Sequence, residues 1–181
     1  MASIAIPLFV NFTAKARQAE VKANLRGWYS GQIAHFSEAG RYSELVADAA
    51  TSPERGNRYA YLFGAACTYQ VRSAAITTTP ANANCISADI WRFPTLPIAS
   101  PAAAIVATFA GAGPDPGLPG LAGACPNCNI AAVATSNIDA EANGVDTRMV
   151  STQSGTVVDC TGGIDTQVAG ELRHVEHAAL M

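Results

Sequence analysis

Charged residues are scarce in this chain. Of its 181 residues, 14% are Asp, Glu, Lys or Arg, whereas soluble domains contain about 25%. Because disorder driven by charge requires few apolar residues, a composition that is 49% hydrophobic excludes it. With only 11 Lys and Arg and a net charge of −3, the chain also lacks the cations with which nucleic-acid-binding proteins neutralise phosphates. No nucleic acid is therefore expected as a primary partner.

Long hydrophobic runs are also missing. A transmembrane helix needs about 20 largely apolar residues. Residues 93–114 carry no charge but contain four prolines, which remove helical hydrogen bonds that lipid cannot replace. Residues 2–12 are apolar but about half the required length, and they have neither a basic n-region nor an obvious cleavage site. This start is interpreted as the end of a hydrophobic helix whose first part is missing.

A single long helix is predicted over residues 8–38, which contain no proline. Its apolar stripe repeats at about 3.6 residues, and Ala39-Gly40 supplies a stop; the stripe consists of Val21, Leu25, Trp28, Gln32 and Phe36. At 1.5 Å per residue this helix is roughly 45 Å long, so its apolar end should project from a small domain. Pro7 predicts a kink or a break upstream.

The remainder of the chain favours strands. Tyr59, Tyr61 and Phe63 alternate within residues 58–63, the period of a strand with an aromatic face. Further strands are expected over residues 68–72, 86–93, 104–109, 130–135 and 148–151, with an irregular crossing over 110–128 and a second helix over 168–180. The expected fold class is α+β, in which a helical segment (1–40) packs on an antiparallel sheet within a globular part (41–181).

Five cysteines raise three alternatives, namely a redox pair, a zinc site or structural disulfides; they are Cys67, Cys85, Cys125, Cys128 and Cys160. A zinc site needs a second pair at suitable spacing, which is absent, so disulfides in an exported domain with a small core are favoured. A Cys67–Cys85 bridge would join two neighbouring strands and stabilise the fold by roughly 3 kcal/mol. Cys160 is expected to pair with one of the other two.

Catalytic and metal-binding patterns are weak, so neither an enzyme nor a cofactor nor a metal is expected. His174 and His177 share one face of the predicted second helix, but two solvated side chains are the simpler interpretation. His35 has no nearby Ser or Cys nucleophile, and Gly111-Ala-Gly113 precedes a proline rather than a helix.

The first 42 residues combine three kinds of segment: an apolar segment that contains a proline, a segment rich in charge and glutamine, and a run of aromatics. They are Ile4-Ala-Ile-Pro7-Leu-Phe-Val-Asn-Phe12, Lys15-Ala-Arg-Gln-Ala-Glu-Val-Lys-Ala-Asn-Leu25, and Trp28, Tyr29, Phe36 and Tyr42. This order resembles the N-terminal helix of type IVa pilins. Ser52-Pro-Glu-Arg-Gly-Asn-Arg-Tyr59, Cys85-Ile-Ser87 and Cys125-Pro-Asn-Cys-Asn129 further resemble the large major pilins of the myxobacterial type. The similarity extends to about residue 155.

The resemblance implies a structural subunit of a type IV pilus that serves adhesion and twitching or gliding motility. Such subunits are inserted in the bacterial inner membrane, cleaved, methylated and polymerised there by the pilus assembly machinery, and the filament meets host or abiotic surfaces. Relative to the family, about fifteen residues ahead of Ser3 are absent, including the peptidase site. Two explanations are considered for these missing residues: the chain has been shortened, or its start has been assigned at an internal methionine. In this form the chain is expected to be soluble and not to assemble.

Two sets of residues are predicted to join copies of the chain. The filament core would be formed by the apolar residues Ile4, Ile6, Pro7, Leu8, Phe9 and Phe12. Charge contacts with the acidic C-terminal half of neighbouring copies would use Lys15, Arg17, Lys22 and Arg26. The alternatives are a type II secretion pseudopilin or minor pilin, and, from another class, an exported disulfide-bonded module that binds a ligand.

Overall fold

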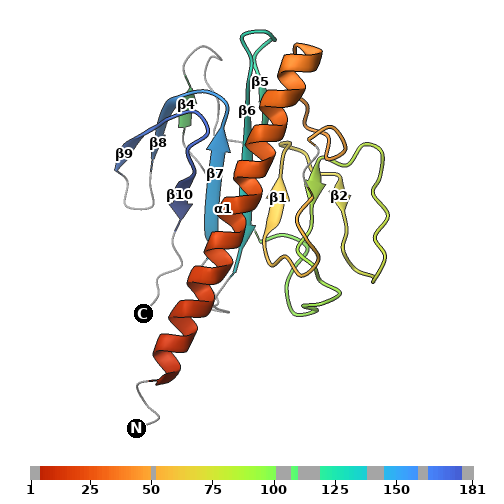
Figure 1. Ribbon diagram of the computed structural model, residues 1–181, viewed down its shortest axis with the longest axis vertical. Helices are drawn as coiled ribbons and strands as arrows, with labels where there is room; N and C mark the ends of the chain where they lie inside the picture. The colour runs from red at the N-terminus through yellow and green to blue at the C-terminus, as the bar shows by residue number, and fades with distance from the viewer. Residues whose placement is uncertain are drawn as a thin grey trace.

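The computed structural model describes residues 5–49, 52–100, 107–109, 119–137, 145–158 and 163–176. One long helix, α1 (Ala5–Ala39), lies across a mainly antiparallel sheet (Figure 1). The predicted α+β class, with a long helix on an antiparallel sheet, is confirmed.

Helix α1 ends where the sequence indicates, but it begins at Ala5, three residues before the predicted start at residue 8. Pro7 lies in its first turn, where proline is tolerated because the N–H it lacks has no helical acceptor. The predicted kink upstream of Pro7 falls largely outside the described residues. At the other end Gly40 has a φ of 68°, and its N–H donates to the carbonyl of Phe36 at 2.8 Å. Glycine adopts this left-handed conformation without steric cost, so the helix ends there.

One stripe of α1 is buried against the sheet. Its members recur every three, four or seven residues and are at most 3% exposed: Ala14, Val21, Leu25, Trp28 and Gln32. The Trp28 ring stacks on Phe63 with a centroid separation of 5.4 Å. Aromatic pairs at this spacing add to the free energy gained by burial alone. The stripe therefore fixes the rotation of α1 about its own axis.

Gln32 fixes the chain that follows the helix. Its side-chain amide donates to the carbonyl of Ser43 at 2.7 Å, and its carbonyl accepts from the N–H of Ser43 at 3.1 Å. A buried amide that satisfies both a donor and an acceptor of the backbone avoids the desolvation cost of unpaired polar groups. The connection from α1 to the sheet thus folds back along the last turns of the helix.

The main sheet has the order β10-β7-β6-β1-β3-β2, with β5 also paired to β6. Its strands are β1 (Ala60–Leu62), β2 (Tyr69–Gln70), β3 (Cys85–Ile86), β5 (Gly120–Ala122), β6 (Asn129–Ser136), β7 (Asp146–Ser151) and β10 (Arg173–Glu176). All these pairs are antiparallel except β2 with β3.

Strand β6 is buried along its whole length, on both faces. Ile130, Ala132 and Ala134 belong to the core that includes α1, whereas Ala131 and Val133 belong to a second cluster with Met149 and Val157. Successive side chains of a strand point to opposite faces, so β6 contributes to two cores at once. The second core includes Val157 of a smaller antiparallel sheet, β4-β8-β9, made of β4 (Ala107–Phe109), β8 (Gly155–Val158) and β9 (Ile164–Gln167).

Each of the six predicted strands overlaps an observed strand. The observed strands are β1, β2, β3, β4, β6 and β7. The predicted strand over 86–93 is wrong beyond Ile86, because the following residues form turns, with the Phe93 N–H donating to the Asp89 carbonyl at 2.9 Å. The crossing over 110–128 was predicted to be irregular, yet β5 lies within it.

The helix predicted over residues 168–180 is wrong within the described part of that range. Gly170, with a φ of 74°, lies in a turn, and residues 173–176 form β10 beside β7. The free edge of β7 offers backbone hydrogen bonds to this segment, and that pairing overrides the local preference for helix.

The N-terminal part of α1 extends beyond the edge of the sheet (Figure 1). With 35 residues, the helix is roughly 52 Å long. Phe12 in this part is 69% exposed. No helix in the described part of the chain is both long and apolar enough to cross a membrane.

Trp28→Ala should lower the free energy of unfolding by about 3–5 kcal/mol, because it removes a buried ring and its stacking on Phe63. Chemical denaturation measures this change. Ile33→Ala, which alters a side chain of the same helix that is 39% exposed, should change stability by less than about 1 kcal/mol. Equal losses in the two variants would contradict the assignment of the buried stripe.

Candidate assembly surface

The projecting part of α1 carries the predicted filament-core residues. Ile6, Pro7, Leu8 and Phe9 lie in the first turns of the helix, and Phe12 follows one turn later. Ile4 and the side chains of the residues before Phe12 lie outside what the structure describes. Phe12 itself is an exposed aromatic side chain. A single exposed apolar side chain does not mark a binding surface, so it is the position of Phe12 near the start of α1 that makes it a candidate for assembly.

The predicted charge contacts divide into two groups. Lys15, Lys22 and Arg26 are exposed, and the helical repeat of about 100° per residue places them within about 40° of one another. These three residues form one edge of the exposed face of α1, which we term the basic edge. Arg17 is half-buried and lies toward the opposite edge. The structure therefore groups three of the four predicted residues and separates the fourth.

A pocket of about 390 Å³ lies between α1 and the loop that precedes β1; it is lined by Glu20, Ala23, Asn24, Glu54, Arg55 and Gly56. We term it the acidic notch. Burial raises the pKa of the Glu20 carboxyl above its ordinary value, and the nearby Glu54 raises it further, against an opposing effect of Arg58. Sequence analysis missed this pair, because Glu54 is distant in sequence and only the fold brings it beside the helix.

Two arginines beside the acidic notch are held by other groups. The Arg58 guanidinium lies over the Phe93 ring, 4.0 Å from its centroid. Burial lowers the pKa of Arg58, as does the charge of Arg17, while Glu20 raises it. Arg55 forms an ion pair with Asp89, at 2.8 Å from Nε to Oδ2.

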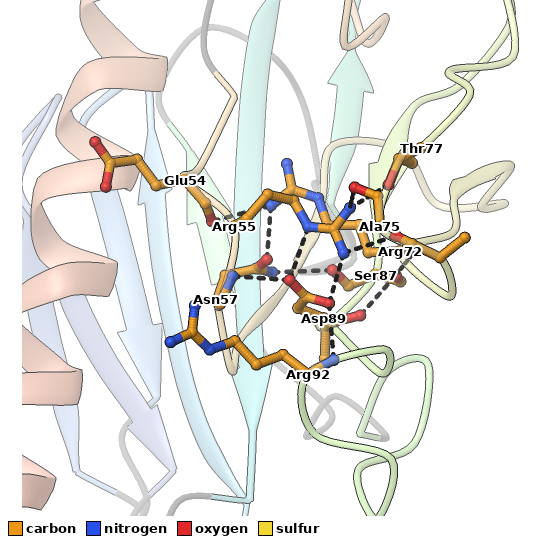
Figure 2. Close-up of polar contacts among 12 residues, drawn as sticks. Glu54, Arg55, Asn57, Arg72, Ala75, Thr77, Ser87, Asp89 and Arg92 are labelled. Carbon is orange, nitrogen blue, oxygen red and sulfur yellow. Dashed lines mark hydrogen bonds and ion pairs between the residues drawn. The ribbon is translucent and has the colours of Figure 1, made fainter.

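Asp89 is the centre of a polar network that holds the loop beside α1 (Figure 2). Its carboxylate accepts from Arg55 Nε and Nη2 at 2.8 and 2.9 Å, from the Gly56 N–H at 2.8 Å and from the Arg92 N–H at 3.2 Å. Burial raises the pKa of Asp89, but these hydrogen bonds outweigh that effect and hold it below its ordinary value. The side chain is therefore an ionised structural anchor with its acceptor sites occupied.

Arg72 extends this network from the other side. Although it is buried, its guanidinium donates to Asn57 Oδ1 at 2.6 Å, to the Glu54 carbonyl at 3.1 Å and to Ser52 Oγ at 3.0 Å. The Asn57 side chain in turn donates to the Ser87 carbonyl at 2.9 Å. In sequence, residues 52–59 indicated only a turn and a family resemblance; the long-range partners that explain the motif come from the segments around β2 and β3.

Two disulfides are present in the described residues. Cys67–Cys85 is confirmed, with Cα atoms 5.4 Å apart, and it joins β3 to the segment before β2. The prediction that Cys160 pairs with Cys125 or Cys128 is wrong, because those two cysteines pair with each other at a Cα separation of 4.4 Å. They flank the turn between β5 and β6, which brings them together locally. Cys160 lies outside the described residues.

Metal-binding geometry is not found in the described part of the chain, where no three His, Cys, Asp or Glu side chains are grouped to hold an ion. His174 lies in β10 opposite Arg148, so its predicted helical spacing with His177 is wrong. His177 falls outside the described residues.

Comparison with known proteins identifies close similarity. The family described as "Type IV pilin PilA" matches residues 12–145. The "Type IV major pilin protein PilA" of Myxococcus xanthus (strain DK1622) is 40% identical over 149 residues, which is 78% of this chain and 68% of the relative. The match includes the basic edge, the acidic notch and the Asp89 network.

Asp89→Asn should destabilise the fold at pH 7 by about 1–3 kcal/mol, because a buried carboxylate that accepts from Arg55 and two backbone N–H groups loses its charge. The pKa of Asp89 is lower in the folded protein than in the unfolded chain, so its ionised carboxylate stabilises the fold at pH values above the unfolded-state pKa. This stabilisation is lost as the pH falls through the folded-state pKa. The difference between the two proteins should therefore shrink below about pH 4.

Asp165→Asn serves as the matched control, since that carboxylate also pairs with an arginine but its side chain is 52% exposed. Its loss should cost less than about 1 kcal/mol. Denaturant unfolding as a function of pH measures both variants. An Asp89→Asn protein as stable as the wild type at pH 7 would show that the network does not hold the loop.

Proposed function

The chain belongs to the type IV pilin PilA family, and from that membership we propose that it is the repeating structural subunit of a type IV pilus filament. The match covers most of the chain, including much of α1 and the main sheet. Members of this family serve as structural proteins. The pseudopilin and ligand-binding alternatives have no comparable support.

The observation that carries the proposal is the length of α1 relative to its sheet. The sheet covers the helix from about Ala14 onward, and the part before it projects (Figure 1). Removing apolar area from water contributes about 25 cal/mol per Å². Bundling the projecting ends of many copies therefore provides the cohesion that one copy alone lacks.

The contacts in the bundle are assigned as follows. The filament core is formed by the apolar first turns of the helix, namely Ile4, Ile6, Pro7, Leu8, Phe9 and Phe12. Lys15, Lys22 and Arg26, and from the other side Arg17, make charge contacts between copies. Because exposed charge pairs are individually weak, they determine how the helices align more than how strongly they bind.

The cellular setting follows from the proposed filament. The pilus lies at the cell surface, and its subunits pass through the inner membrane, where the pilus assembly machinery polymerises them. Attachment to host or abiotic surfaces and motility by pilus extension and retraction are the activities proposed for the assembled filament.

Phe12→Arg should reduce the yield of filaments sheared from cells at least tenfold, because it places a charge in the apolar core of the bundle. The stability of the monomer should stay within about 0.5 kcal/mol of wild type, since Phe12 is 69% exposed. Immunoblotting of sheared and cellular fractions measures the yield.

Ile76→Arg is the control, because Ile76 is 89% exposed but lies in a loop of the globular part. It should leave the filament yield within about threefold of wild type, a difference below 1 kcal/mol. Normal filaments from the Phe12→Arg protein would contradict the proposed function.

A further inference from the structure

We propose that neighbouring copies join through a directional charge contact, in which the basic edge of one α1 docks into the acidic notch of the next copy. The partner is a second copy of this chain, so the inference rests on the proposed filament. The inference names both sides of the charge contact. The positive side is the basic edge, with Lys15, Lys22 and Arg26, and the negative side is the carboxylates of Glu20 and Glu54 in the acidic notch.

The acidic notch has carboxylates available for an incoming cation. Within the described residues, neither Glu20 nor Glu54 has a cationic nitrogen within ion-pair distance of its carboxylate. Arg55, although it lines the pocket, is held by Asp89, and the Glu54 side chain extends toward α1 and away from the Arg55 guanidinium (Figure 2). The Arg58 guanidinium lies over Phe93.

The notch is also positioned before any partner arrives. The N–H of Gly56, in its wall, donates to Asp89, and the carbonyl of Glu54 accepts from the buried Arg72. On the α1 side, the Asn24 side-chain amide donates to the Tyr61 hydroxyl at 2.8 Å, which ties the helix to the sheet. A preorganised acceptor loses little conformational entropy on binding, so its charge contacts favour association more than those of mobile side chains.

The two surfaces lie on different edges of the same helix. At about 100° per residue, Lys15, Lys22 and Arg26 are each separated from Glu20 by about 120–160° around the axis. A symmetric pair of helices would need both surfaces on one face, so this separation disfavours a closed dimer. Each copy instead offers its basic edge to one neighbour and its acidic notch to another, which is a heterologous contact that continues without closing.

Charge reversal tests the contact in filaments sheared from cells. Glu54→Lys and Lys22→Glu should each lower the yield of sheared filaments at least tenfold, by placing like charges opposite one another, and the double variant should recover to within about threefold of wild type. Asp165→Lys, a reversal of an exposed carboxylate in β9, should leave the yield unchanged. Single variants that assemble normally, or a double variant that does not recover, would overturn the docking proposal.

Zero-length carbodiimide cross-linking provides a second test that needs no variant. In filaments assembled from a mixture of 14N- and 15N-labelled subunits, Lys15 or Lys22 of one isotope should be joined to Glu20 or Glu54 of the other. Inter-copy links from these lysines only to other carboxylates would overturn the proposal. If wild-type cells yield no filaments of this chain, the proposed function itself fails, which distinguishes the two failures.

Discussion

The structure depends on a mismatch between the length of α1 and the size of the sheet it covers. A stripe from Ala14 to Gln32 is buried by the globular part, whereas Phe12 is left exposed. Within the described residues, the sheet does not reach the first turns of the helix (Figure 1). Because burial of apolar area drives association, covering the projecting end between copies is the source of cohesion that the proposed filament uses. The assembly of the family follows from this constraint.

The rest of the molecule holds α1 in one orientation. Trp28 and Gln32 fix its rotation and its exit, and β6 supplies small side chains that let the helix lie close to the sheet. The Asp89 network positions the loop at the acidic notch through partners in the segments that follow β2 and β3. A rigid globular part matters for a filament, since a small error in the angle of the helix would accumulate along successive copies.

The sequence predicted those elements whose signals are local. The stripe on α1, the stop at Gly40, the aromatic face of β1 and the Cys67–Cys85 bridge all follow from spacing within short segments. The strand at β10 was mistaken for a helix, because its conformation is decided by pairing with β7 rather than by its own residues. The acidic notch was missed for the same reason, since Glu20 and Glu54 meet only after the chain folds.

Hydroxyl-radical footprinting of Phe12 in monomers and in filaments tests the central claim most directly. Oxidation of an aromatic side chain reports its contact with water, and Trp91, which is 58% exposed in the globular part, provides the internal reference. If the projecting helix ends form the filament core, the oxidation rate of Phe12 relative to Trp91 should fall at least tenfold on assembly. An unchanged ratio would mean that the exposed end of α1 stays in water, and would contradict the account.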